Sequence, residues 1–220
     1  MHIAEGFLPP LWAVAWTLFA APFVAYGTYR VTTWVRKSPE RMAMLALAGA
    51  FMFVLSAMKL PSVTGSTSHP TGTGIAVVMF GPGVTAVLST VVLLYQSLLL
   101  AHGGITTLGA NVASMGIIGP AIGWLGYRAV RGPTSVVTGT FVATVLANVT
   151  TYLVTATQLG IAFPAGKGIS GMIAAAGNFA AIFAVTQLPI AIIEGLLAAA
   201  MIKQLLAVKP AVTAKLGVAT

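Results

Sequence analysis

The chain has 220 residues, of which 58% are apolar and only 6% are charged, and its mean hydropathy is +0.97. Soluble domains carry roughly 25% charged residues, so this composition excludes an ordinary soluble protein and predicts an integral membrane protein. The formal net charge of +8 comes from eleven basic residues scattered between apolar runs, which form no basic face, so nucleic acid is not expected as a partner. The absence of cysteine excludes disulfides, thiolate metal sites and cysteine nucleophiles.

The first ten residues, MHIAEGFLPP, do not read as a cleavable leader. A signal peptide requires a basic segment before its apolar core, and here the first basic residue is Arg30, beyond the first apolar run. Glu5 and the two prolines also fit poorly in such a leader. We therefore expect this segment to be retained.

Apolar runs long enough to cross a hydrocarbon core of ~30 Å predict an all-α fold with seven transmembrane helices. The run over residues 72–101 is interrupted by Gly81-Pro82-Gly83, and glycine and proline both disfavour a continuing helix. We therefore expect a short third helix followed by a full fourth one. The other predicted spans are residues 11–29, 42–58, 108–127, 136–157 and 179–202.

The basic residues predict how these helices are oriented. With the amino terminus outside, nine of the eleven lie in the cytoplasm, and only Lys59 and Lys167 lie outside. Reading residues 72–101 as one long helix would instead place Arg128 and Arg131 outside, so seven helices are favoured. The carboxyl terminus is then cytoplasmic. All three histidines fall in outer segments, in the amino terminus, the STSHPTGTG loop and the AHGGITT loop: His2, His69 and His102.

A histidine at position 2 allows a chain to chelate a divalent ion through three nitrogens. The amine of Met1 and the deprotonated amide nitrogen of His2 close a five-membered ring, and that amide nitrogen and the His2 Nδ1 close a six-membered ring. One equatorial place remains, which a second imidazole such as His69 can fill. Four nitrogens in a plane suit Cu(II), Ni(II) or low-spin Co(II) better than Zn²⁺ or Mg²⁺. The alternative is a surface histidine at a frayed terminus, although the stiff, apolar GFLPP stretch favours a terminus that tucks inward.

Four motifs occur in order along the chain: MHIAEGFLPP, GSTSHPTGTG, FGPG and HGGITTLGANVASMGIIGPAIG. Together they resemble the CbiM/NikM family, the substrate-binding (S) membrane components of energy-coupling-factor transporters for cobalt and nickel. The resemblance covers nearly the whole chain, with a departure at Ala4, where a larger apolar residue is expected. It implies seven helices, an amino terminus inserted into an outer cavity, and metal held by the Met1 amine, the His2 amide nitrogen and ring, and the His69 imidazole.

The resemblance also implies a role and a set of partners. The chain would be a high-affinity Co²⁺ capture subunit of an ATP-driven importer that supplies cobalamin biosynthesis, with Ni²⁺ as the alternative cargo, and not an enzyme. Its partners would be a CbiQ-like transmembrane coupling protein, a pair of CbiO-like ATPases and a CbiN-like accessory membrane subunit. The location would be the lipid bilayer of the bacterial cytoplasmic (inner) membrane. No nucleotide is expected on this chain, since GIAFPAGKG departs from a phosphate-binding loop in spacing and in the residue after the lysine.

We expect one transmembrane substrate-binding domain over residues 1–220, with a metal-chelating segment at 1–10 and an outer ligand loop at 61–71. Two other function classes compete with this interpretation. An intramembrane protease would need a motif such as HExxH or GxSxG, or paired carboxylates, and the sequence has none of these. A passive channel or secondary carrier for a small solute is the other alternative. Secondary carriers often have duplicated halves, and no convincing repeat is visible.

Three further polar residues are candidates for supporting the ligands. Ser68 is expected to orient His69. His102 is expected to support the site or its loop, because four nitrogens already complete the plane. Asn111 is expected either to hold a ligand imidazole through a hydrogen bond or to bond a neighbouring helix.

Glu194 lies inside the last predicted span, where an ionisable residue is costly and usually functional. It precedes Lys203 by about nine residues, so we expect it in the cytoplasmic half, far from the metal site. One interpretation is a contact that couples the chain to its partners. The other is a protonated side chain bonded to a neighbouring helix.

Overall fold

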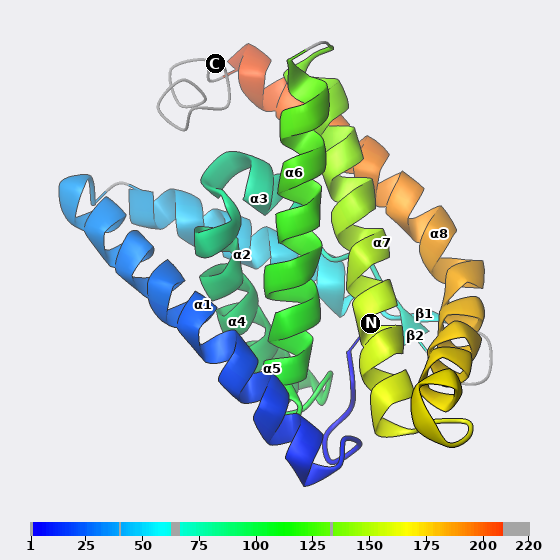
Figure 1. The fold of residues 1–220 in the computed structure, drawn as a ribbon. Coiled ribbons are helices and arrows are strands. Elements are labelled where there is room, and N and C mark those ends of the chain that lie inside the picture. Colours follow the sequence, from blue (N-terminus) through cyan, green and yellow to red (C-terminus); the bar gives the residue numbers. More distant parts are fainter. Residues whose placement is uncertain (1, 40, 63–66, 133, 209–220) are drawn as a thin grey trace.

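The structure is a computed structural model that describes residues 2–39, 41–62, 67–132 and 134–208. Within these ranges the chain consists of helices joined by short loops, with a single pair of two-residue antiparallel strands (Figure 1). The elements are α1 (Pro10–Lys37), α2 (Arg41–Ala57), β1 (Leu60–Pro61), β2 (Thr67–Ser68), α3 (Thr73–Phe80), α4 (Pro82–Leu100), α5 (Leu108–Asn111), the π-helical η2 (Val112–Ile118), α6 (Gly119–Arg131), α7 (Val136–Ala162) and α8 (Gly168–Val208).

Five helical segments of the described chain are long and apolar enough to cross a membrane. They are α1, α4, the continuous run α5–η2–α6, α7 and α8. The helix α2 is apolar but has only 17 residues, and α3 has eight. The chain is therefore an all-α, multi-pass membrane protein, as its composition predicts. Each of the seven predicted spans coincides with a helix or a continuous helical run, while the number that cross the bilayer stays a prediction.

The break between α3 and α4 falls at the predicted glycine-proline sequence. Gly81 has φ 79° and ψ 169°, a conformation that side-chain-bearing residues rarely adopt, and Pro82 opens α4 with its fixed φ. The helix α3 is buried from Thr73 to Val78. The short third helix is thus confirmed, and it lies in the interior.

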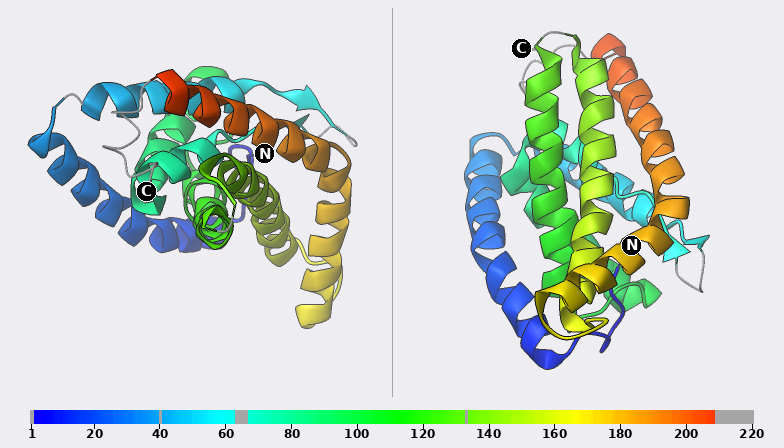
Figure 2. Two further views of the ribbon diagram at one scale, coloured as in Figure 1. Left: turned by 90° about the horizontal axis from the view of Figure 1, so that it is seen from above. Right: turned by 45° about the vertical axis from the view of Figure 1, so that its right-hand side comes forward.

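Two helices extend beyond their predicted limits. The helix α1 continues to Lys37, and its last turn carries basic residues, which the negative end of the helix dipole stabilises. The helix α8 begins at Gly168 instead of residue 179, and it changes direction along its length (Figure 2). Pro189 lies inside it, and a proline removes one intrahelical hydrogen bond and crowds the preceding turn, which bends a helix.

Residues 2–8 form a segment that we call the amino-terminal strap, which runs from the start of α1 into the interior (Figure 1). Ile3 and Leu8 are buried and belong to a core cluster with Tyr152 of α7 and Phe183 of α8. The inward-tucked segment predicted from GFLPP is therefore confirmed for the described residues. Met1 lies outside them.

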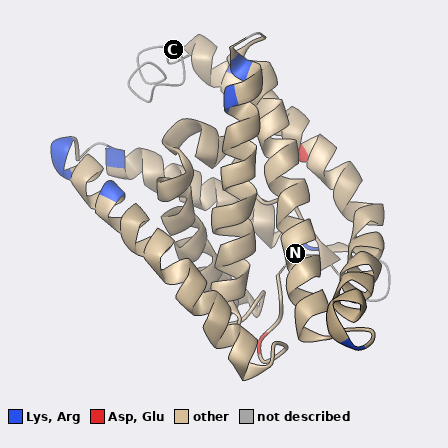
Figure 3. Ribbon diagram, viewed as in Figure 1, with Lys and Arg blue, Asp and Glu red and all other residues tan. Residues whose placement is uncertain are grey.

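Basic residues gather where α1 meets α2 and at the carboxyl end of α6 (Figure 3). Lys167 belongs to the segment between α7 and α8, and the turn that joins these two helices is at the opposite end of the molecule. This separation is the one that the predicted orientation requires. Which end faces the cytoplasm stays a prediction.

Candidate metal centre

Three imidazoles meet in the interior, each from a different segment: His2 from the strap, His69 from the loop after β2, and His102 from the loop after α4. Their ring centroids are 4.5 Å (His2–His69), 4.2 Å (His2–His102) and 4.9 Å (His69–His102) apart. One nitrogen from each ring can be chosen so that all three lie within 4.8 Å of one another. Metal–nitrogen bonds of ~2.0–2.1 Å place two opposite ligands about 4 Å apart, so small shifts would let the three rings bind one ion.

All three rings are held in the neutral form that binds metal. His69 is fully buried and His102 is 6% exposed. Burial removes the rings from water and lowers the pKa of His2 and His69 well below the usual range. The same cause lowers the pKa of His102 to about 3. At neutral pH each imidazole therefore keeps a lone pair, and no proton has to leave a ring when an ion binds.

The hydrogen bond of His69 fixes which of its nitrogens can coordinate. Its Nδ1 lies 2.8 Å from the carbonyl oxygen of Pro70. A carbonyl oxygen only accepts, so Nδ1 carries the proton and Nε2 of the neutral ring carries the lone pair. The proline that follows also restricts the backbone of His69 to extended conformations. The imidazole is thus preset in both tautomer and direction.

His2 presents the nitrogen that the chelate argument requires. Its Nδ1 is buried and has no hydrogen-bond partner among the described residues, while its Nε2 lies 3.3 Å from the Sδ of Met115 in η2. Met115 is not among the residues predicted from the sequence, although it follows Asn111 by one helical turn. Met1, the first residue of the predicted ligand set, lies outside the described residues.

Asn111 acts on the strap and not on an imidazole. Its Oδ1 accepts from the backbone nitrogen of Ile3 at 2.8 Å, and its Nδ2 donates to the Ile3 carbonyl oxygen at 3.0 Å. The hydroxyl of Thr107 donates to the same carbonyl at 2.7 Å. Asn111 was expected to bond either a ligand imidazole or a neighbouring helix. Its observed partner is instead the backbone of Ile3, the residue after His2. It fixes the position of His2 through the chain.

Glu5 ties the strap to the loop that carries His102. Its carboxylate accepts from the hydroxyl of Thr106 and from the backbone nitrogens of Ile105 and Thr106, and these bonds lower the pKa of Glu5. Gly104 lies directly against the strap, because a Cβ there would fall 2.4 Å from the Glu5 Cα. The strap and the loop are therefore in backbone contact, with no room for a side chain between them.

The structure corrects one part of the expectation for Glu194, namely that it lies far from the metal site. Its carboxylate accepts from the backbone nitrogen and hydroxyl of Thr71 at 2.9 and 3.0 Å, from the backbone nitrogen of Gly72 at 2.7 Å, and from the Asn148 Nδ2 at 2.6 Å. Thr71 is two residues from His69, so Glu194 is not far from the candidate centre. The spacing between Glu194 and Lys203 along α8 does not reveal this proximity, because the loop that follows His69 reaches inward to meet α8. Backbone N–H groups donate, so these contacts fit an ionised carboxylate better than a protonated one.

We call residues 67–72 the His69 loop, and α8 fastens it at further points. Gln187 donates through Nε2 to the carbonyl oxygen of His69 at 3.0 Å and to the Asn148 Oδ1 at 2.8 Å. Ser68 was expected to orient His69, but its hydroxyl lies 2.7 Å from that of Thr186 in α8. The attachments therefore lie on both sides of Pro189, with Thr186 and Gln187 before it and Glu194 after it. Gln187 and Thr186 are not among the residues predicted from the sequence, although a glutamine inside an apolar span is the same kind of signal as Glu194.

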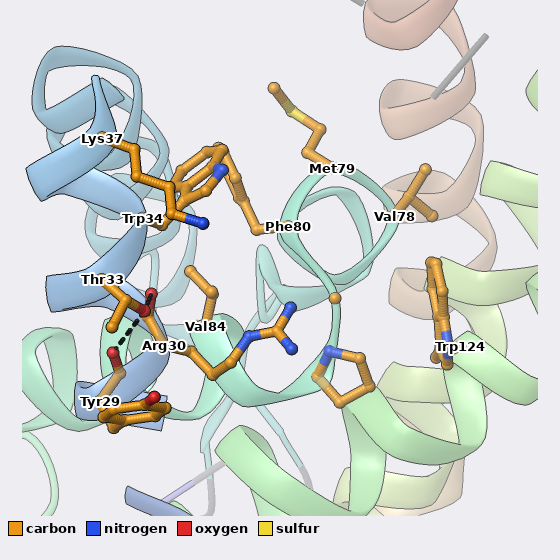
Figure 4. Close-up of a pocket in the computed structure, with 12 residues that line it drawn as sticks. Tyr29, Arg30, Thr33, Trp34, Lys37, Val78, Met79, Phe80, Val84 and Trp124 are labelled. Carbon is orange, nitrogen blue, oxygen red and sulfur yellow. Dashed lines mark hydrogen bonds between the residues drawn. The ribbon is translucent and has the colours of Figure 1, made fainter. Parts of the chain in front are cut away.

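A cavity of about 780 Å³ lies apart from the histidines, between α1, α3, the start of α4, and α6 (Figure 4). Two cationic and several aromatic side chains line it, and no described carboxylate does. The charged and aromatic residues are Arg30, Lys37, Tyr29, Trp34, Phe80 and Trp124. The two positive charges and the lack of carboxylates disfavour a divalent cation, so we do not expect a metal ion in this cavity.

Comparison with known proteins gives one consistent result. The family model CbiM, described as the cobalt uptake substrate-specific transmembrane region, matches residues 2–212. The "Cobalt transport protein CbiM" of Streptomyces coelicolor is 51% identical over 219 residues, which cover 99% of this chain and 94% of that protein. A protein of Haloquadratum walsbyi that also carries the CbiM name is 62% identical over 202 residues, 92% of each chain.

Solved structures show the same fold. Two crystal structures described as transition metal transporters align over 94% of this chain, with TM-scores of 0.80 and 0.79 and with 93% and 99% of their own chains covered. Their sequence identities are 23% and 24%, so the likeness is one of fold.

Proposed function

Because the chain belongs to the CbiM family of cobalt-uptake transmembrane proteins, we propose that it captures Co²⁺ with high affinity as the substrate-binding subunit of an ATP-driven energy-coupling-factor importer. It is a transport protein and not an enzyme, in line with its relatives. The observation that carries the proposal is the meeting of three neutral imidazoles, the half-buried His2 and the buried His69 and His102, at the inner end of an anchored strap. The cobalt would supply cobalamin biosynthesis.

The proposed ligands are four nitrogens: the Met1 amine, the His2 amide nitrogen, the His2 Nδ1 and the His69 Nε2. The unpartnered Nδ1 of His2 and the tautomer of His69 support this set. The hydrogen bonds between Asn111 and the backbone of Ile3 support it as well, because they hold the preceding residue, His2, next to His69. Within the single domain of residues 1–220, the chelating segment is then 1–10 and the ligand loop 61–71.

The proposed partners are a CbiQ-like coupling protein, a CbiO-like ATPase pair and a CbiN-like accessory subunit. We propose that they act on the ion through α8, since Gln187 and Glu194 hold the His69 loop. A movement of α8 would pull His69 away from the strap and release the cargo. The relatives include bacterial and archaeal proteins, so the location proposed is a prokaryotic cytoplasmic membrane and not the bacterial inner membrane alone.

The decisive experiment converts the Met1 amine into an amide and leaves the rest of the chain unchanged. Purified protein that begins at Met1 is expected to bind one Co²⁺ per chain in a calorimetric titration, and one glycine placed before Met1 is expected to abolish tight binding. A glycine added after the last residue is the matched control. His2→Ala and His69→Ala are expected to lose tight binding as well. Undiminished affinity in the extended protein would contradict the ligand set, and a wild-type protein that binds no Co²⁺ would favour a channel or carrier.

Nickel is the alternative cargo, because a planar nitrogen set accepts both ions and the order of divalent affinities slightly favours Ni²⁺. Competition between Co²⁺ and Ni²⁺ on the purified protein decides between them. Displacement of bound Co²⁺ by equimolar Ni²⁺ would reassign the cargo.

A further inference from the structure

His102 is a buried imidazole whose hydrogen-bonding capacity is unused. Neither of its ring nitrogens has a hydrogen-bond partner among the described residues, and the side chain is 6% exposed. Buried polar atoms in folded proteins are nearly always paired, because leaving one unpaired forfeits its solvation without compensation. Two such atoms on one ring therefore indicate a missing partner.

The ring of His102 lies against the rings of both proposed ligand histidines. The ring centroid of His102 is 4.2 Å from that of His2 and 4.9 Å from that of His69, with interplanar angles of 48° and 82°. These ring contacts leave both nitrogens of His102 without a hydrogen-bond partner among the described residues. An ion between the three rings would satisfy one nitrogen of His102 directly.

The backbone conformation of the loop after α4 places His102 next to His2 and His69. The backbone nitrogen of His102 donates to the Gln96 carbonyl oxygen at 3.1 Å, after Ala101 has ended α4 with a left-handed φ of 47°. Gly103 follows with φ 83°, and a Cβ there would fall 3.4 Å from the His2 Cβ. The loop therefore packs directly on the residue that the strap brings in.

We propose that His102 is a fifth ligand of the transported ion, bound on the axis of the nitrogen plane. This inference rests on the proposed function, because the four nitrogens of that proposal fill the plane and leave only axial places. An axial imidazole also bears on metal choice. Low-spin Co(II) has a single electron in the d orbital that points along this axis, so one axial ligand stabilises the complex. In planar Ni(II) the same orbital is filled and repels an axial lone pair. His102 thus favours cobalt over nickel.

Electron paramagnetic resonance of the Co(II)-loaded protein tests this assignment. One axial nitrogen-14 nucleus splits the cobalt hyperfine lines of a low-spin, five-coordinate ion into triplets, and equatorial nitrogens do not resolve in this way. We expect triplets in the wild-type protein, their loss in His102→Ala, and their return when free imidazole fills the space left by the ring. His102→Gln, which keeps a polar side chain, is a second variant if the alanine protein does not fold.

The control variant is Ser89→Ala, which also removes a buried, unpartnered polar atom but lies outside the cluster. It is expected to keep the triplets. Loss of His102 is further expected to lower the preference for Co²⁺ over Ni²⁺ roughly tenfold, the lower end of what supporting residues at metal sites contribute. Bound low-spin cobalt without triplets in the wild type, or triplets that persist in His102→Ala, would overturn the axial ligand while leaving the proposed function intact. A wild-type protein that binds no cobalt would overturn both.

Discussion

At the scale of single residues, the candidate centre depends on side chains that do not touch an ion. Asn111 pairs with both backbone groups of Ile3, and Glu5 collects donors from the loop at residues 105–106. Both sets of hydrogen bonds, at Ile3 and at Glu5, hold the strap just after His2. The strap can therefore change its path only if both sets break. The position of His2 is therefore set by contacts within the protein itself.

Gly104 offers a direct test of how closely the strap must fit. In Gly104→Ala the new Cβ would lie 2.4 Å from the Glu5 Cα, so the strap must move. Overpacking of this kind costs about 1–3 kcal/mol, which corresponds to a loss of Co²⁺ affinity of roughly ten- to hundredfold in a titration. Gly177→Ala is the matched control, since its Cβ meets nothing within 4 Å in α8. Equal affinities in the two variants would show that the backbone contact is dispensable.

At the scale of elements, apolar run length predicted every helix, and the glycine-proline sequence predicted the break after α3. The limits of α1 and α8 were not predictable in the same way, because a helix continues into polar surroundings wherever its residues still favour it. The π-helical η2 and the direction of α8 after Pro189 depend on packing between distant segments. For the candidate metal centre, the sequence predicted only that the three histidines lie in segments on the outer side of the membrane. Their meeting required loop paths that no local pattern encodes.

Glu194 connects two elements, because its side chain joins α8 to the His69 loop. In Glu194→Gln an amide replaces a carboxylate, so one oxygen is lost and an N–H₂ group faces donors. Hydrogen bonds to charged groups contribute about 1.5–3 kcal/mol, so we expect the loop to loosen and Co²⁺ to dissociate roughly tenfold faster in a chelator-chase measurement. Gln204→Glu, the reverse change at an exposed position on the same helix, is expected to have no effect. An unchanged dissociation rate in Glu194→Gln would mean that the contact does not hold the loop.

At the scale of the whole molecule, the separation of basic residues predicts which ends of the helices face outward. The chain contains no cysteine, so single cysteines can report on orientation without background. Lys167→Cys is expected to react with a membrane-impermeant maleimide in intact cells, and Thr134→Cys only after the membrane is opened. Both side chains are exposed in the folded protein. The opposite labelling pattern would invert the orientation and move the histidine cluster to the cytoplasmic half.

The burial of His69 and His102 has a consequence for how the protein must be handled. If the proposed site holds the cargo, an ion bound against these side chains exchanges with solvent only when a neighbouring segment moves, so its residence time depends on that movement and not on the strength of the bonds alone. We therefore expect cargo acquired in the cell to survive purification and to be removed only slowly by a competitor in the buffer. Protein purified without added metal is then expected to contain bound ion, and its occupancy has to be measured by elemental analysis before any titration begins.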